Sequence, residues 1–134
     1  MANRILFVED EQFIAELYAQ VLEGAGYEVK IVGDGLEGLH AAQQEHFDIV
    51  LLDLMLPTMM GMDILRALRD KVKTPGFTAP VIILTNLDED DLTKHEINEM
   101  AQGYLTKAEI SPKQLVEYLR KFGAPSPRPA KVSA

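Results

Sequence analysis

Short apolar runs alternate with amphipathic stretches along this chain, and the alternation predicts its fold class. Strands are predicted at 5–8, 27–32, 48–52 and 81–84, with a brief fifth strand at 103–106. Helices are predicted between and after them, at about 13–22, 34–45, 64–70, 89–100 and 111–119. Several strands are apolar throughout, as is typical of strands that are covered on both faces. The sequence therefore predicts an α/β domain with a parallel sheet and helices on both sides of it.

Capping residues mark the ends of three of these helices. Asp34 and Glu37 have the spacing of a capping box, and Ser111 is predicted to cap the last helix. The segment 24–26, Gly-Ala-Gly, is predicted to stop the first helix. The apolar face of that helix is predicted to consist of Phe13, Ile14, Leu17, Tyr18, Val21 and Leu22.

Length and composition indicate one domain and exclude several classes of protein. The chain has 134 residues and no cysteine, so it has no disulfide framework and no thiolate metal site. Its net charge of -8 opposes nonspecific binding of nucleic acid. No apolar run approaches the roughly 20 residues that cross a bilayer, and none resembles a signal peptide, so we expect a cytoplasmic protein. Residues 1–122 are predicted to form the domain, and the Pro-rich segment 123–134 a flexible tail or linker.

Polar residues follow four of the five predicted strands at the point where each strand ends. They are Glu9, Asp10 and Glu11 after the first, Asp53 after the third, Thr85 and Asn86 after the fourth, and Lys107 after the fifth. Ligands of parallel sheets bind beyond the carboxyl ends of the strands. Clustered carboxylates suit a hard cation such as Mg²⁺, and an ammonium and a hydroxyl suit the oxygens of a phosphoryl group. The residues therefore suggest a metal-assisted phosphoryl site.

Each of these residues also has a plainer interpretation when it is taken alone. The acidic run 9–11 could be a solvated turn, and Thr85 or Asp53 could cap a helix. Lys107 could be a surface charge, and Tyr104 a packing residue. The placement of these residues together at the strand ends favours the site over the separate explanations.

Four segments resemble the response-regulator receiver domain of bacterial two-component signalling. They are Val8-Glu9-Asp10-Glu11, Leu51 to Pro57 with Gly61 downstream, Leu84-Thr85, and Tyr104 to Lys107. The resemblance runs from about residue 3 to residue 122. It implies a flavodoxin-like (βα)5 doubly wound sandwich whose five-stranded parallel sheet has the order 2-1-3-4-5.

The resemblance implies a role for each matching residue. Asp53 matches the aspartate that accepts a phosphoryl group from a phosphohistidine. Asp10 and Asp53 match direct ligands of Mg²⁺, or of Mn²⁺ in its place, with the backbone carbonyl of Met55 as a third ligand. Glu9 matches the acidic position that holds the metal through water.

Three further positions match the residues that bind the phosphoryl group and respond to its presence. Lys107 matches the lysine that binds a phosphoryl oxygen, Thr85 the switch hydroxyl, and Tyr104 the switch aromatic. In this family the hydroxyl moves toward the phosphoryl group and the ring rotates inward. The change remodels the face made by the fourth helix, the fifth strand and the fifth helix.

The implied function is a phosphorylation-dependent signalling switch rather than an enzyme that turns over external substrates. Self-catalysed phosphotransfer and autodephosphorylation are expected. The expected partners are a sensor histidine kinase or histidine phosphotransfer protein, and a downstream protein target or output domain. A phosphorylation-dependent homodimer is a further option, whereas no nucleic acid and no membrane is expected to bind this domain.

Two positions depart from the family pattern. Ala108 stands where a proline, often preceded by a cis bond, usually follows the lysine. A cis bond before a residue other than proline costs about 2.5–4 kcal/mol, so the sequence leaves open a trans bond or an altered loop. Asn86 stands where Ala, Ser or Gly usually follows the threonine, and we expect it, with Met55, to tune access to Asp53.

Three rival functions fit the sequence less well. A dinucleotide-binding enzyme would need a glycine-rich turn where this chain has the acidic run 9–11. A phosphatase of the haloacid-dehalogenase type would need a second aspartate at Met55, and a receiver used only for binding would lack the site residues, which are all present. The methionines at 55, 59, 60 and 62 either fill the loop and core or form an adaptable docking surface, and the sequence favours filling.

Overall fold

The computed structural model describes residues 4–87 and 90–123, in which five strands form one parallel sheet. The elements are β1 Arg4–Val8, α1 Gln12–Gly24, β2 Glu28–Val32, α2 Gly35–Gln44, β3 Ile49–Leu52, α3 Gly61–Arg69, β4 Val81–Thr85, α4 Asp91–Met100, β5 Gly103–Thr106 and α5 Pro112–Leu119, with 3-10 turns at Lys107–Glu109 and Arg120–Phe122. The strand order is β2-β1-β3-β4-β5. The predicted fold class and strand order are therefore confirmed.

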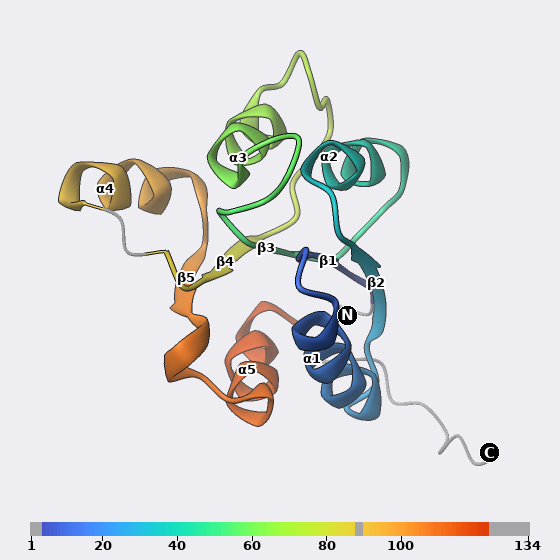
Figure 1. Ribbon diagram of the computed structural model, residues 1–134. Coiled ribbons are helices and arrows are strands. Elements are labelled where there is room, and N and C mark those ends of the chain that lie inside the picture. The colour runs from blue at the N-terminus through green and yellow to red at the C-terminus, as the bar shows by residue number, and fades with distance from the viewer. Residues whose placement is uncertain (1–3, 88–89, 124–134) are drawn as a thin grey trace.

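The helices cover both faces of the sheet, as Figure 1 shows. Helices α2, α3 and α4 lie on one face, with α4 at the β5 edge, and α1 and α5 lie on the other. Side chains of β1 alternate between the two cores, because successive residues of a strand point to opposite faces. Leu6 and Val8 pack toward α2 and α3, whereas Ile5 and Phe7 pack toward α1 and α5. Strands β1, β3 and β4 are almost entirely buried for this reason. Their carboxyl ends carry the acidic residues and Thr85, whereas Lys107 follows β5.

The predicted apolar face of α1 is wrong in two positions. Phe13 is 79% exposed and Leu17 is 44% exposed. The buried face of the helix instead consists of Ala15, Tyr18, Ala19 and Leu22. Small alanine side chains let the helix lie close to its neighbours, and a pattern based on large apolar residues does not detect them.

The helix ends follow the predicted caps with small shifts. The box at Ser111 forms: Ser111 Oγ accepts from Gln114 N–H at 3.1 Å, and Gln114 returns a bond to Ser111 N–H. Asp34 caps α2 by accepting from the N–H groups of Leu36 and Glu37. Helix α1 continues through Gly24, and the chain turns at Gly26, whose φ is 109°.

Two predictions concern residues that the structure does not describe. The tail at 124–134 lies outside the described residues, as does position 89, where the fourth helix was predicted to begin. Within the described residues, α4 starts after its cap Asp90, which accepts from Thr93 N–H at 2.8 Å. None of the helices in the described ranges has the length and apolar character needed to span a membrane.

Candidate functional site

Backbone pairing at the carboxyl edge of the sheet brings the ends of β1 and β3 together. Asp53 N–H donates to the carbonyl of Val8 at 3.1 Å, and Glu9 N–H donates to the carbonyl of Val32 at 3.0 Å. These bonds continue the strand ladders by one residue beyond each strand. The two carboxylates are therefore carried on rigid backbone.

The chain then turns back sharply after Asp53, and Gly61 makes this turn feasible. Gly61 N–H donates to the carbonyl of Leu54 at 3.0 Å. A Cβ at position 61 would lie 2.3 Å from the carbonyl oxygen of Asp53 and 2.6 Å from Cα of Leu54. Only glycine permits this approach of α3 to the end of β3.

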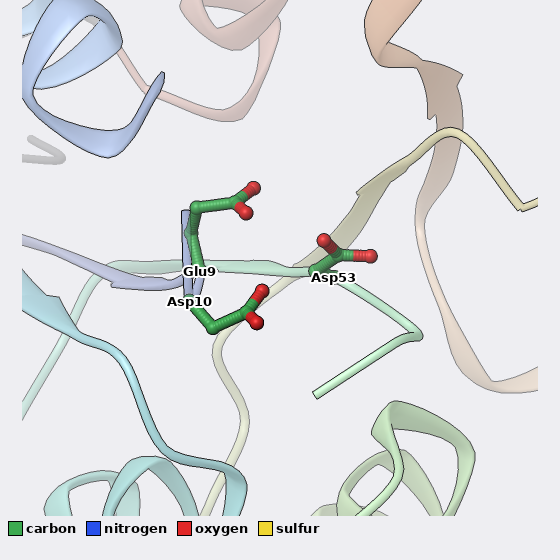
Figure 2. A group of neighbouring side chains, drawn as sticks. All are labelled: Glu9, Asp10 and Asp53. Atoms are coloured by element: carbon green, nitrogen blue, oxygen red, sulfur yellow. The ribbon is translucent and has the colours of Figure 1, made fainter. Parts of the chain in front are cut away.

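Three carboxylates gather at this edge. One oxygen each from Glu9, Asp10 and Asp53 lies within 4.8 Å of the others. Figure 2 shows Glu9 and Asp10 leaving the chain after β1 on the side where Asp53 stands at the end of β3. Glu9 and Asp53 are buried, whereas Asp10 is exposed. Buried charges of one sign are costly unless cations accompany them.

Lys107 supplies a cation to the two buried carboxylates. Its Nζ lies 2.8 Å from Glu9 Oε1 and 2.9 Å from Asp53 Oδ2, and its side chain is only 6% exposed. A third carboxylate, that of Glu11, lies 3.5 Å from the same nitrogen. The ammonium therefore links the loop after β1 to the end of β3.

The pKa values of Lys107 and Glu9 reflect this arrangement. Burial alone would lower the pKa of the Lys107 ammonium, but hydrogen bonds to Glu9 and Asp53 and the charges of both outweigh burial and raise it. Burial raises the pKa of the Glu9 carboxyl, and the hydrogen bond from Lys107 opposes that rise only in part. Lys107 is thus charged at neutral pH, whereas burial disfavours the charged form of Glu9.

The other oxygen of Asp53 faces a hydroxyl and a backbone donor. Thr85 Oγ1 donates to Asp53 Oδ1 at 2.6 Å, and Met55 N–H donates to the same oxygen at 3.1 Å. Thr85 Oγ1 also accepts from Leu87 N–H at 3.2 Å, and Tyr104 donates its hydroxyl to the carbonyl of Leu87 at 2.7 Å. A chain of hydrogen bonds therefore runs from Asp53 through Thr85 and the backbone of Leu87 to Tyr104.

The two departures from the family pattern meet in space. Asn86 Oδ1 accepts from Ala108 N–H at 2.9 Å. No peptide bond within residues 4–87 and 90–123 is cis, so the bond between Lys107 and Ala108 is trans, and the chain there forms the 3-10 turn Lys107–Glu109. Of the alternatives left open by the sequence, the trans bond is the one observed.

The donor set fits a hard divalent cation. Its three carboxylate oxygens are close together, and Mg²⁺ favours oxygen ligands while keeping several waters. Exposure of Asp10 leaves one side of the cluster open to water. A cation held by this cluster and the Lys107 ammonium would together offset the charge of a phosphoryl group on Asp53, and the Thr85 hydroxyl would donate a hydrogen bond to it.

Comparison with known proteins identifies the family. The family model for the response regulator receiver domain matches residues 5–120. This chain belongs to that family. Receiver domains serve two-component systems as phosphorylation switches, and they bind Mg²⁺ at an acidic site. The resemblance of the four sequence segments is confirmed.

Curated relatives of this receiver domain are longer regulators. The DNA-binding response regulator MtrA of Mycobacterium tuberculosis is 36% identical over 120 residues, which are 90% of this chain and 50% of that protein. The uncharacterized transcriptional regulatory protein YkoG of Bacillus subtilis is 43% identical over 124 residues, which are 91% of this chain and 50% of that protein. This receiver chain thus spans about half the length of these relatives.

A solved receiver domain has the same fold. The crystal structure of the BeF3-activated N-terminal receiver domain of Klebsiella pneumoniae RstA superposes with a TM-score of 0.77 at 33% identity. The match covers 90% of this chain and 97% of that one.

Sequence reasoning missed two parts of the receiver's site. Leu87 links Thr85 to Tyr104 through its backbone N–H and carbonyl. Any residue other than proline has both groups, so the side chain at this position gives no signal of the role. The bond from Ala108 to Asn86 was also missed, although a signal for it exists: both residues follow a site residue at the ends of paired strands.

The methionines near Asp53 divide between the two alternatives. Met59 and Met62 pack against the core, as the filling interpretation expects. Met55 and Met60 are 56% and 48% exposed, so they are available to a partner. Each interpretation therefore accounts for two of the four side chains.

Proposed function

We propose that this receiver accepts a phosphoryl group on Asp53 and passes the change to the face made by α4, β5 and α5. The observation that carries the proposal is the environment of Asp53. Its buried carboxylate has the Lys107 ammonium 2.9 Å from one oxygen and the Thr85 hydroxyl 2.6 Å from the other. Two donors thus lie beside the carboxylate oxygens, one of which would carry the phosphoryl group.

The acidic cluster would hold the cation that such a transfer needs. Asp10, Asp53 and the backbone carbonyl of Met55 would bind Mg²⁺, or Mn²⁺ in its place, with Glu9 acting through water. When bound, the cation supplies positive charge that offsets the charge of the carboxylates and of the phosphoryl oxygens.

The chemical step needs little beyond alignment and charge neutralisation. A carboxylate oxygen of Asp53 attacks phosphorus, and the bond between phosphorus and the histidine nitrogen breaks. The electron pair leaves with the imidazole, and an acyl phosphate forms on Asp53. Lys107 would then bind a phosphoryl oxygen, and Thr85 would turn its hydroxyl from the carboxylate to another phosphoryl oxygen.

The hydrogen-bond chain beyond Thr85 supplies the route to the surface. Any displacement of Thr85 Oγ1 alters its bond from Leu87 N–H, and the carbonyl of the same residue holds the Tyr104 hydroxyl. Tyr104 lies on β5, half-buried, between α4 and the groove beside α5. We propose that this aromatic ring reports the state of Asp53 to a downstream partner.

Exposed apolar side chains beside the site suit contact with the phosphoryl donor. Phe13 stands in the first turn of α1, three residues after Asp10, and Met55 and Met60 flank the loop after Asp53. These three side chains would dock a histidine kinase or a histidine phosphotransfer protein. The donor brings its own activated phosphohistidine, so the receiver need not activate one.

The output of this receiver follows one of two routes. Residues 1–122 would form the receiver, and residues 123–134 a tail or a linker to a further domain. MtrA is named a DNA-binding regulator, and a regulator of that kind would place DNA contact outside this acidic domain. The alternative is direct contact with a protein target, or pairing of two phosphorylated copies.

A phosphatase that turns over external phosphate esters is the rival function. Met55 offers no acid or base two residues after Asp53, so only slow autodephosphorylation is expected. Met55 would limit the approach of water to the acyl phosphate. Multiple turnovers of a generic phosphate ester would overturn this assignment.

Beryllium fluoride with Mg²⁺ tests the proposal without a partner protein. The trifluoride is a tetrahedral substitute for a phosphoryl group and must bond to a carboxylate oxygen. We expect binding to the parent protein and none to Asp53→Asn, read by ¹⁹F NMR. Binding that survives in Asp53→Asn, or no binding to the parent, would contradict the role of Asp53.

A further inference from the structure

We infer that Asn86 is a positioning residue that holds Lys107 on Asp53 through the backbone N–H of Ala108. The inference rests on the proposed role of Lys107 at the phosphoryl site. Its observation is the 2.9 Å hydrogen bond from Ala108 N–H to Asn86 Oδ1.

The N–H of Ala108 needs a partner from outside its own turn. Ala108 is the second residue of the 3-10 turn Lys107–Glu109, and the first N–H groups of such a turn have no acceptor within it. Thr106, which precedes the turn, makes no side-chain cap. Asn86 therefore caps this turn from the neighbouring strand.

The hydrogen bond joins two loops that serve the same carboxylate. Strands β4 and β5 pair with Thr85 opposite Thr106, so Asn86 and Lys107 occupy the next positions along each strand. Thr85 reaches Oδ1 of Asp53 at 2.6 Å, and Lys107 reaches Oδ2 at 2.9 Å. A bond between the residues that follow Thr85 and Lys107 fixes the separation of the hydroxyl and the ammonium.

The hydrogen bond also joins Asn86 and Ala108, the two residues that depart from the family pattern, into one structural feature. A proline at position 108 would have no N–H to donate, and an alanine at position 86 would have no side-chain acceptor. Each residue of the pair therefore matters only while the other is present.

Two explanations of the role of Asn86, its bulk and its hydrogen bond, predict different effects of substitution. Asn86 is exposed, so its bulk is not needed to fill the core. Asn86→Leu keeps the bulk and removes the acceptor, whereas Asn86→Asp keeps an acceptor of the same shape. If Asn86 acts by its bulk, Asn86→Leu should resemble the parent protein. If Asn86 acts by positioning, Asn86→Leu should lose the hydrogen bond that caps the turn, and Asn86→Asp should keep it.

The first measurement is amide hydrogen exchange of Ala108 in the unphosphorylated full chain. We expect exchange roughly tenfold faster in Asn86→Leu than in the parent, because a hydrogen bond that protects the amide is lost. Asn86→Asp should stay near the parent. Equal exchange in the parent and in Asn86→Leu would overturn the inference.

The second measurement is phosphorylation by acetyl phosphate with Mg²⁺, followed by intact mass. We expect Asn86→Leu to be slower by about three- to tenfold, the effect of one lost hydrogen bond. In the Ala108→Pro background the same change should have no further effect, because the donor is already absent. Asn98→Leu, the same change at an exposed position of α4, should keep the parent rate.

The outcomes separate this inference from the proposed function. A slowing by Asn86→Leu that persists unchanged in Ala108→Pro would show that bulk acts, and would overturn the inference. A parent protein that takes no phosphoryl group would contradict the proposed function instead. In that case the exchange of the Ala108 amide still decides whether Asn86 holds the turn.

Discussion

The ammonium of Lys107 lies 2.9 Å from Oδ2 of Asp53, and both side chains are almost fully buried. The same nitrogen lies 2.8 Å from Glu9. One cation thus serves two buried carboxylates, and Asp10 adds a third carboxylate to the cluster. The site carries an excess of negative charge that a divalent cation would relieve.

Removing the charge of Lys107 should destabilise the fold. Lys107→Met leaves the carboxylates of Glu9 and Asp53 buried without a cation, and breaking a buried pair in this way costs about 3 kcal/mol. Urea unfolding at neutral pH in the presence of a chelator measures this loss. Adding Mg²⁺ should restore part of it, because binding to the native state alone stabilises that state.

An exposed lysine on α5 provides the control for that change. Lys113→Met should alter the free energy of unfolding by no more than about 0.5 kcal/mol. If Lys107→Met proves as mild as Lys113→Met, the ion pairs of Lys107 do not stabilise the protein.

The effect of Glu9→Gln on the free energy of unfolding should become more stabilising as the pH rises. Burial raises the pKa of Glu9, so folding favours its protonated form. The contribution of that form is fully present below the ordinary pKa of 4.5 and is lost as the pH rises through the raised native pKa. Glutamine does not titrate, so the variant should gain stability relative to the parent as the pH rises from the ordinary value of 4.5 through the raised native pKa of Glu9. Unfolding measured without divalent cation checks this, and a difference that is constant or falls with pH is the contrary result.

Gly61→Ala should disturb the turn after Asp53. The new Cβ would lie 2.3 Å from a carbonyl oxygen and 2.6 Å from a Cα, and neither backbone atom can move freely. We expect a loss of about 1–3 kcal/mol in urea unfolding, the usual range for overpacking. Gly24→Ala is the matched control: no atom lies within 4 Å of its Cβ, and the helix should gain up to about 1 kcal/mol. Equal effects at the two glycines would refute the close approach.

Phe13→Ala should separate docking from chemistry. The Phe13 ring is 79% exposed, so the free energy of unfolding should change by less than about 0.5 kcal/mol. Phosphorylation by acetyl phosphate should keep the parent rate. Transfer from a phosphorylated histidine kinase that labels the parent should be slower, and an unchanged rate would rule out Phe13 as a docking residue.

Tyr104→Ala should prevent a change at Asp53 from altering the face made by α4, β5 and α5. The variant loses the hydroxyl that binds the carbonyl of Leu87, but it keeps Asp53, Thr85 and Lys107. We expect beryllium fluoride to bind as in the parent, with amide chemical-shift changes that no longer extend to α4 and α5. Tyr104→Phe, which keeps the ring, distinguishes the role of the hydroxyl from that of the ring. Shift changes as extensive in Tyr104→Ala as in the parent would contradict the switch role.

The sequence predicted the fold because its apolar pattern is strong where the sheet is buried. Runs such as 49–52 and 81–84 are typical of strands buried at the centre of a parallel sheet, and both runs are buried there. The side chains grouped around Asp53 could be predicted as well, since each follows a strand and the carboxyl ends of parallel strands share one edge.

Some features depend on how closely two backbone segments approach each other, and the sequence did not predict them. Packing of α1 through Ala15 and Ala19, and not through Phe13, depends on how closely the helix approaches the sheet. The bond between Asn86 and Ala108 is different: the paired strand ends bring the two residues close, but its formation also depends on the shape of a turn that has no proline. Leu87 acts through its backbone, which no side-chain pattern records.

Covalent labelling of Asp53 tests the central claim most directly. Parent protein and Asp53→Asn are incubated with acetyl phosphate and Mg²⁺, and their intact masses are followed over time. We predict one added phosphoryl group on the parent, lost again slowly, and none on Asp53→Asn. A phosphoryl group that persists in Asp53→Asn, or a parent that remains unlabelled, would contradict the account.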